Sequence, residues 1–386
     1  MYKTGELAAQ RIESYCRTWR LWIDNAEGVI SGNSIMSADS SMQATSLSDD
    51  IELGAVCSQS WQLSIADSSE NFLGKEYDLS LYLVDYSHGE TTYSTLESYT
   101  YAELSKLTVE QISKLGEVLD GERIPLGRFT CVKSKKSGGN TEVTFADRLY
   151  FSDKVYKPNV TLPAWSKAIE DDICKQLGLQ NGNDYTIPAK LRVKGGARLY
   201  GKGHIRLKTA NFDFKINTVP KDTTMRQMLS YIASAQGEFG FVDRYGRYVR
   251  KWYGSSVKIL DNNTIDLPTL GERPNILAGI VCKVSDSETL RLGNTTGSTG
   301  RVLEFENPYM TSSLLQSLWH RIQGFSWYTT ELFHRLGDPR FDIGDVVTYD
   351  SGTETFDIPI TNLGFNFDGG LSADISAVGL SVEEQL

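Results

Sequence analysis

One segment of the sequence matches part of a phosphate-binding loop. Residues 196–202, GARLYGK, fit the first seven positions of the pattern GxxxxGK, whose backbone amides and lysine surround nucleotide phosphates. The next residue is Gly203, where the pattern requires the serine or threonine that holds magnesium. The segment that follows, residues 204–208, alternates in polarity like a strand, whereas a phosphate loop must lead into a helix. We therefore interpret the segment as a glycine-rich hairpin or loop and expect no nucleotide cofactor.

A second segment combines basic and aromatic side chains. Between residues 244 and 253, basic and aromatic residues interleave: Arg244, Arg247, Arg250 and Lys251 with Tyr245, Tyr248, Trp252 and Tyr253. Such a segment can hold single-stranded nucleic acid by stacking and charge pairing. It also fits a single β-hairpin with aromatic cross-strand pairs and a solvated charged face. The net charge is −10, whereas nucleic-acid-binding domains are usually basic, so we favour the hairpin and expect no specific nucleic-acid binding.

The other reactive side chains do not form a recognisable catalytic or metal site. No HxxxH or HExxH pair occurs among the four histidines, so a zinc hydrolase lacks its ligand set; they are His88, His204, His320 and His334. No GxSxG motif marks a nucleophilic serine. We interpret His320, which follows Trp319 in an expected helix, as a packing or surface residue. Asp171 and Asp172 are adjacent and point to different sides of a helix, and an unmarked carboxylate pair elsewhere stays open. We assign no catalytic, cofactor-binding or metal-ligating residue.

The cysteines and the N-terminus bear on where the chain is made. The cysteines are scattered and form no CxxC pair, which favours small core residues in a reducing compartment over disulfides or zinc; they are Cys16, Cys57, Cys131, Cys174 and Cys282. Residues 1–13 lack the basic-then-apolar pattern of a signal peptide. No apolar run approaches the roughly 18 residues that span a bilayer. We expect synthesis in the cytoplasm and no membrane insertion.

The length of 386 residues allows two or three domains, and the first predicted one covers residues 1–153. A short amphipathic helix is expected over residues 5–18. Alternating apolar residues predict strands at about residues 19–23, 77–86, 125–132 and 141–149, and a pair of strands over residues 51–65. Capping-box signatures at Thr100 and Thr108 predict two short helices inserted at about residues 100–120.

The middle region, residues 154–256, is predicted to be α+β. One helix begins near Pro163 and ends at Gly178, and a second covers residues 222–235. A hairpin follows over residues 239–252 and turns at Tyr245 and Gly246.

The third region, residues 257–386, returns to β structure and contains one helix at about residues 311–322. It ends in residues 341–379, where apolar and polar residues alternate at period two between glycine-containing turns. This meander must close on itself or pair with a partner to hide its edges.

One loose pattern, apolar-x-apolar-Gly-x-apolar, occurs three times in the sequence. It covers residues 51–56, 124–129 and 341–346. A glycine at this place suits a bend where a strand enters a barrel. Chance is one explanation, because six loose positions are easy to match. The other is that the first and third regions are related β-barrels.

Three stretches resemble the baseplate hub proteins of phage tails. Residues 341–379, FDIGDVV…FDIPITNLGFNFDGGLSADISAVG, resemble the end of the second barrel of that family. Residues 222–253 resemble its helix followed by a hairpin, and residues 124–153 resemble the closing strands of its first barrel. The family includes the hubs of contractile tails and of phage-tail-like bacteriocins and injection systems, and the hub domain of siphophage tail-associated proteins. The resemblance lies in order and spacing and spans residues 15–380.

The resemblance implies a mainly β fold with α+β parts. Two related antiparallel β-barrel domains are expected: residues 1–153, with the helical insertion at about 100–120, and residues 257–386, with the helix at about 311–322. An α+β middle domain, residues 154–256, lies between them. As in the family, the chain is expected to form a homotrimer whose six barrels make a ring with near six-fold symmetry. That ring joins the six-fold tail tube to the three-fold spike or tip.

The partners implied by the resemblance are the tail tube or distal tail protein, the central spike or tip protein, and the tape-measure protein. The location implied is the baseplate of a virion tail assembled in the host bacterial cytoplasm. The ring would line an acidic channel for DNA, tape-measure protein or an effector. Because the sequence stops at Leu386, just after the expected second barrel, we expect any spike or lysin to be a separate chain and this chain to be no enzyme.

Two other functions stay open at the level of the sequence. One is a cell-wall glycan or peptidoglycan hydrolase of the tail tip that uses unmarked carboxylates. The other is a tail tip protein that binds a host receptor. Cell-wall zymography tests the first, and binding of the isolated chain to intact cells tests the second.

Overall fold

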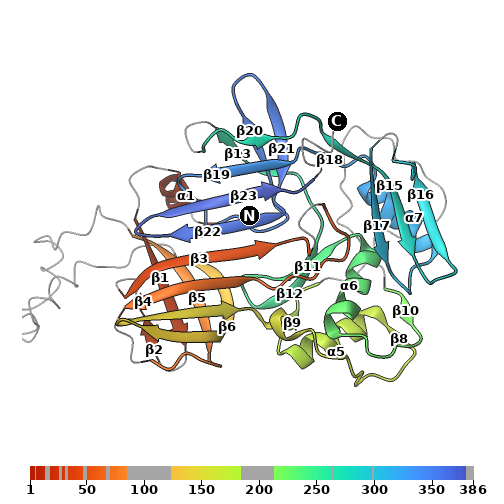
Figure 1. Ribbon diagram of the computed structural model, residues 1–386, viewed down its shortest axis with the longest axis horizontal. Helices are drawn as coiled ribbons and strands as arrows, with labels where there is room; N and C mark the ends of the chain where they lie inside the picture. Colours follow the sequence, from red (N-terminus) through yellow and green to blue (C-terminus); the bar gives the residue numbers. More distant parts are fainter. Residues whose placement is uncertain are drawn as a thin grey trace, which may run out of the picture.

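The computed structural model describes most of the chain. The described residues are 1–4, 6–13, 18–25, 28–30, 34–46, 50–66, 70–84, 123–183, 213–261, 265–297 and 300–379. They form a mainly β structure in which strands from both ends of the chain lie side by side (Figure 1). The helical insertion expected at about residues 100–120 lies outside the described residues.

Strands from the first and third regions form one 11-stranded antiparallel sheet. Its order is β14-β19-β23-β22-β3-β4-β7-β6-β5-β1-β2. The first region supplies β1 (Thr18–Asn25), β2 (Gly28–Ile30), β3 (Ile35–Gln43), β4 (Ser60–Ala66), β5 (Glu76–Val84), β6 (Arg123–Ser137) and β7 (Asn140–Ala146). The third region supplies β14 (Thr269–Leu270), β19 (Thr330–His334), β22 (Asn362–Phe367) and β23 (Leu371–Ala377). The two sets meet where β22 pairs with β3.

The structure corrects the expectation of two closed barrels. In the described part of the chain the large sheet is open, with β14 and β2 at its two ends. The closing meander is divided between two sheets. Its strands β20 (Val346–Asp350) and β21 (Thr355–Pro359) join β13 (Ser256–Asp261) in a separate three-stranded sheet. Its strands β22 and β23 hide an edge by pairing with β3 of the first region, so the meander does not close on itself.

Around the middle of the chain the predicted helices and hairpin are confirmed. Helix α5 (Ser166–Leu177) ends at Gly178 and helix α6 (Met225–Gln236) ends at Gly237, both in the left-handed conformation that glycine adopts easily. The N-terminus of α6 is a capping box formed by Thr224 and Gln227. The hairpin consists of β11 (Phe239–Val242) and β12 (Arg247–Lys251), and β12 also pairs with β9 (Gln180–Asn181).

Smaller elements complete the molecule. In the middle region, β8 (Ala164–Trp165) pairs with β10 (Lys215–Ile216), and the 3-10 helix η2 (Arg148–Phe151) follows β7. A small sheet contains β15 (Asn275–Lys283), β16 (Thr289–Gly293), β17 (Arg301–Glu306) and β18 (Ser326–Trp327). Helix α7 (Ser312–Ile322) confirms the third predicted helix, and α1 (Glu6–Ile12) is shorter than expected.

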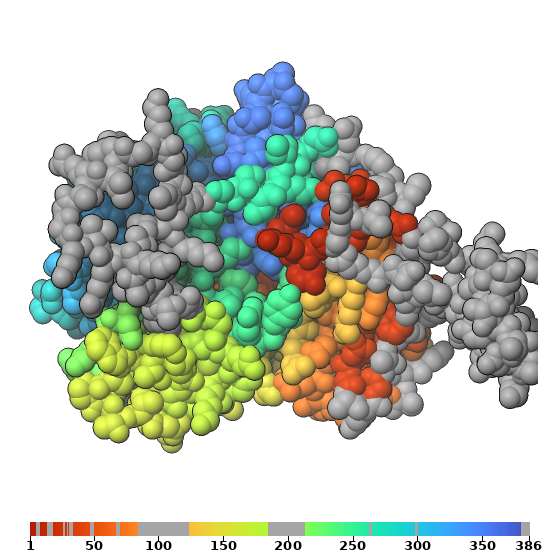
Figure 2. All heavy atoms as spheres, turned by 180° about the vertical axis from the view of Figure 1, so that it is seen from behind, coloured from red at the N-terminus to blue at the C-terminus, as the bar shows by residue number. Residues whose placement is uncertain are grey.

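Two apolar cores lie inside these layers. The larger one contains the inward residues of the 11-stranded sheet together with those of α7 and of the small sheet. The smaller one lies between α5, α6 and the β11–β12 hairpin. Seen from behind, the surface of α5 and its neighbours lies beside that of the first region, and the β20–β21 hairpin projects from the top (Figure 2).

Candidate assembly surface

The outward side of the large sheet is a continuous polar face. Along β22, Leu363, Phe365 and Phe367 are buried and the residues between them point outward. The same alternation holds along the neighbouring strands, and the pairing register places their outward residues in common rows. We call these residues the polar face: Asp39, Ser41, Gln43, Ser60, Gln62, Ser64, Glu142, Thr144, Asn362, Gly364, Asn366, Ser372, Asp374 and Ser376.

A groove of about 450 Å³ lies in one half of this face. It runs over β3, β22, β23 and β19, and residues 266–269 form its rim. Its floor contains Gly364, whose place in the register is between Ser41 and Asp374 on the neighbouring strands. Because glycine adds no side chain to the outward side, the floor is lower here than elsewhere on the polar face. A glycine inside a strand often marks a place where a ligand or another backbone comes close.

The groove combines carboxylates with an apolar rim. Asp266, Glu331 and Asp374 all line it. Asp266 pairs with Arg335, and Asp374 accepts a hydrogen bond of 2.7 Å from the side-chain amide of Asn366. On the rim, the side chain of Leu267 is 81% exposed and that of Phe333 is 39% exposed. Such a groove fits a partner that carries positive charge.

A second feature, residues 338–345, connects three parts of the molecule through ion pairs. The N-terminal ammonium of Met1 and the Lys251 Nζ lie 2.7 and 2.8 Å from the two carboxylate oxygens of Asp345. Arg244 pairs with Asp342 at 2.7 Å. The N-terminus and the β11–β12 hairpin of the middle region are thereby held against the start of the closing meander.

Asp338, the first residue of this feature, is buried between two cations. Arg340 lies 2.7 Å and Lys258 of β13 lies 2.9 Å from its carboxylate. Burial alone would raise the pKa of Asp338, but the hydrogen bonds and charges of Arg340 and Lys258 outweigh it and lower the pKa to about 2. The pKa of Asp345 is also lowered, because Lys251 and the N-terminal ammonium outweigh its burial.

We expect the stability of the chain to depend on Asp338 at acid pH. Its pKa is about 2 in the folded chain and 3.8 ordinarily, so its ionised form stabilises the fold above about pH 4. That contribution, about 2.5 kcal/mol, is lost as the pH falls towards 2. Urea unfolding between pH 5 and 2 should show a flatter pH dependence for Asp338→Asn than for the wild-type chain.

The exposed residue Asp286 is the matched control for this experiment. Asp286→Asn should leave the pH dependence of the wild-type chain in place. Burial raises the pKa of Asp147 to about 6, which contributes with the opposite sign, but it does so equally in all three chains. Parallel curves for the wild type and Asp338→Asn would contradict the role given to this ion pair.

Gly54 and Gly344 belong to two copies of the repeated sequence pattern, and both contact the middle region, one from the first region of the chain and one from the third. The Gly54 N–H donates to the Glu238 carbonyl at 2.8 Å, and the Gly240 N–H donates to the Ala55 carbonyl at 2.7 Å. Gly344 lies against the ring of Phe239, the first residue of β11. The φ angles of Gly54 and Gly344 are positive, at 82° and 73°. Thus the copies of the pattern at residues 51–56 and 341–346 both contact β11 or its flanks. The copy at 124–129 lies within β6, and its Pro125 carbonyl accepts a hydrogen bond of 3.1 Å from Arg244 in the hairpin turn.

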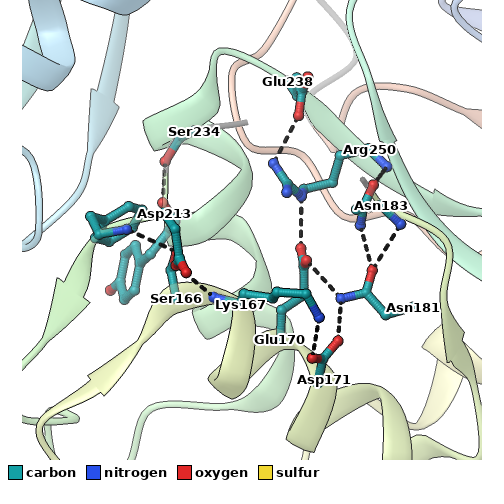
Figure 3. A network of polar contacts seen from close by, with 12 residues as sticks. Ser166, Lys167, Glu170, Asp171, Asn181, Asn183, Asp213, Ser234, Glu238 and Arg250 are labelled. Atoms are coloured by element: carbon teal, nitrogen blue, oxygen red, sulfur yellow. Dashed lines mark hydrogen bonds and ion pairs between the residues drawn. The ribbon is translucent and has the colours of Figure 1, made fainter. Parts of the chain in front are cut away.

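A buried charge network lies inside the middle region (Figure 3). The Arg250 guanidinium donates to Glu170 of α5 at 2.7 Å and to Glu238 at 2.8 Å, and the side chains of Arg250 and Glu170 are 0% exposed. Glu238 also accepts from Arg321 of α7 at 3.0 Å. The network therefore connects α5, β12, the end of α6 and α7 through charges that are hidden from water.

Comparisons with known proteins rest on structure alone. No protein-family model and no curated protein matches the chain. A solved tail protein from Neisseria meningitidis MC58 matches 93% of this chain and 96% of its own, with a TM-score of 0.54 and 10% sequence identity. The chain has the fold of this tail protein.

Two further solved structures cover similar shares at lower TM-scores. The 43 kDa tail protein of prophage MuSo2 from Shewanella oneidensis covers 93% of this chain and 97% of its own, with a TM-score of 0.49 and 12% identity. The prophage tail protein gp18 from Listeria monocytogenes EGD-e covers 94% and 96%, with a TM-score of 0.48 and 9% identity. At such identities the likeness concerns the fold, so no residue role is transferred.

Within the tail-protein fold, the basic and aromatic segment is the predicted hairpin. Its turn contains Gly246, with φ of 71°. Each of its basic side chains pairs with a carboxylate of the same chain: Arg244 with Asp342, Arg247 with Asp243, Arg250 with Glu170 and Glu238, and Lys251 with Asp345. These cations are therefore already neutralised inside the molecule, which supports the hairpin interpretation over nucleic-acid binding.

The other candidate residues are dispersed. The phosphate-loop-like residues 196–202, with His88, His204 and Cys16, lie outside the described residues. His320 is exposed on α7, as predicted, and His334 is buried in β19. Asp171 pairs with Lys167, whereas Asp172 accepts from Tyr156 and Asn159, so the two do point apart.

Over the described ranges, Cys57, Cys131, Cys174 and Cys282 are free and buried, in line with their predicted place in the core. No cluster of three or more His, Cys, Asp and Glu side chains in these ranges is arranged to hold a metal ion. Among the helices of the described ranges, none has the length and apolar character needed to cross a membrane.

Sequence reasoning missed the groove and the ion pairs of residues 338–345. The groove had one signal, since Gly364 interrupts an otherwise regular alternation in NLGFNF. The ion pairs also had a signal in the sequence, because the eight residues DPRFDIGD contain three aspartates. Neither signal names its partners, which come from distant parts of the chain.

Proposed function

We propose that the chain is a structural hub of a phage tail baseplate, which adapts the symmetry of the tail tube to that of the spike or tip. The observation that carries this proposal is the tail-protein fold, which extends over 93% of the chain. In this proposal the chain acts in the tail of a virion, and it catalyses no reaction. Its partners are further copies of itself, the tail tube or distal tail protein, the central spike or tip protein, and the tape-measure protein.

The proposed assembly is a homotrimer with two related β units in each copy. Residues 1–153 and 257–386 form these units, and the α+β residues 154–256 form the part that receives the spike. Support comes from the sheet itself, because β3 and β22 already join strands of the two units side by side. Three such pairs give six β units around an axis, and a ring closes when each contact repeats with the right rotation.

The half of the polar face that lies outside the groove fits the inner wall of such a ring. The residues of the polar face are mostly uncharged, and Asp39, Glu142 and Asp374 are its only charged residues as defined above. A surface without clustered cations does not hold phosphate groups, so DNA or protein can pass without binding. The paired cations of the β11–β12 hairpin point to the same conclusion.

Light scattering of the purified chain tests this proposal. We expect a mass of three times 43.0 kDa for the chain alone, or a complex that contains three copies of it after addition of tail tube and spike proteins. A lasting monomer in the presence of both proteins would contradict the hub function. Zymography on cell walls is the complementary test, and a clear lysis band would favour a hydrolase instead.

A further inference from the structure

The end of the β6–β7 hairpin is a basic prong, which we define as residues 133–139, KSKKSGG. Residues 133–137 of β6 are all exposed, in contrast to the buried residues that precede them. Lys133, Lys135 and Lys136 form no ion pair with any other described residue. Lys135 lies opposite Glu142 in the β6–β7 register, which offsets part of the charge, and the three exposed lysines of the prong still attract an acidic partner.

The groove on the polar face is the acidic counterpart of the prong. Glu331, on its floor, is exposed and forms no ion pair with another described residue, and Asp266 and Asp374 lie along the same groove. Gly364 places no side chain on the floor, where a Cβ atom would lie 3.3 Å from the Ser40 carbonyl oxygen. The groove, at about 450 Å³, is large enough to take the side chains at the tip of a hairpin.

The prong cannot reach the groove of its own chain. Strand β6 is separated from β3, the nearest strand of the groove, by β4 and β7, which corresponds to about 14 Å across the sheet. The two features also lie towards different ends of the strands. The start of β7 is in register with the Ile35 end of β3, whereas the groove lies near Gln43 at its other end.

We propose that the basic prong of one copy of this chain docks into the acidic groove of the next copy. This inference rests on the proposed ring of copies and names the contact that closes it. A head-to-tail ring requires two different, complementary surfaces on each copy. The prong and the groove have opposite charge, lie apart on the same molecule and are both solvent-exposed. Charge pairing of this kind speeds encounter and fixes the register between copies.

Charge reversal on each side tests the contact. The prong variant is Lys133→Glu with Lys135→Glu and Lys136→Glu, and the groove variant is Glu331→Lys with Asp374→Lys. We expect each variant to weaken self-association at least tenfold by light scattering or analytical ultracentrifugation. A chain that carries all five reversals should associate again, because its acidic prong then meets a basic groove at every contact of the ring. High salt should weaken the wild-type assembly in the same direction.

The matched control is Lys157→Glu with Lys221→Glu, which reverses the charge of two exposed lysines that lie outside the prong and the groove. It should leave self-association unchanged. Thermal melts identify any variant that fails to fold.

As a direct probe, Lys135→Cys mixed with Glu331→Cys should form a disulfide between copies under mild oxidation. If both charge-reversal variants self-associate as strongly as the wild-type chain and no such disulfide forms, the proposed contact is wrong. The hub function would not be contradicted by that result. A wild-type chain that stays monomeric with tube and spike proteins present would overturn both.

Discussion

Replacing Arg250 by methionine is expected to lower the free energy of unfolding by about 3–5 kcal/mol. The substitution keeps much of the side-chain volume but removes the cation from between Glu170 and Glu238. Glu170 is 0% exposed, so its carboxylate would remain in a medium of low polarity without the charge of Arg250, although the neutral side-chain amide of Asn181 still donates to it. The cost of such an uncompensated buried charge exceeds that of a lost surface pair several-fold. Urea or thermal unfolding of the purified variant measures it.

Arg247→Met is the matched control for this prediction. Arg247 lies on the same strand, and its side chain is 43% exposed and pairs with Asp243 at 2.6 Å. Because water screens that pair, its loss should cost less than about 1 kcal/mol. A second variant, Arg250→Met with Glu170→Gln, removes the charge left behind at the fully buried Glu170, whereas Glu238 keeps Arg321, and it should recover part of the stability. Equal, small effects of Arg250→Met and Arg247→Met would contradict the role assigned to the buried network.

The second large effect is expected for Gly344→Ala. Gly344 has φ of 73°, where an alanine is strained by about 1 kcal/mol. A Cβ atom at this position would also lie within 2.4 Å of the Phe239 ring, which is itself fully buried. Displacing a packed ring costs about another 1–3 kcal/mol. We therefore expect a total loss of about 2–4 kcal/mol and a weaker attachment of β11 to the closing meander.

Gly352→Ala separates these two contributions. Gly352 is in the β20–β21 turn with φ of 84°, and no atom lies within 4 Å of the place a Cβ would take. Its substitution should therefore cost about 1 kcal/mol from backbone strain alone. Thermal melts of the two variants under one condition provide the comparison. If Gly352→Ala is as destabilising as Gly344→Ala, the contact with Phe239 is not what constrains the pattern.

Local patterns in the sequence were sufficient for the separate elements. Helices α5 and α6 were predicted because their apolar stripes are bounded by strong signals, such as the glycines at positions 178 and 237. The hairpin of β11 and β12 was predicted from alternation and from Gly246. These features depend on residues close together in the chain, so one sequence contains the information that specifies them.

The arrangement of the strands was less accessible to sequence reasoning. Alternation showed that residues 341–379 form strands with one buried face, but it does not specify the partner of an edge strand. The pairing of Leu363 with Met42 joins residues more than 300 positions apart, and it replaced the expected barrel closure by a shared sheet. The groove depends on that pairing, because its floor contains residues of β3 and β22 together.

Electron microscopy of the purified assembly tests the central claim most directly. The hub proposal predicts three copies around an axis, with six β units forming a ring of near six-fold symmetry, whose polar faces outside the groove line the channel. In a phage or phage-like particle, a label on this chain should mark the junction of the tail tube and the spike or tip. A ring with another number of copies, or a label distributed on the cell surface away from that junction, would contradict the account.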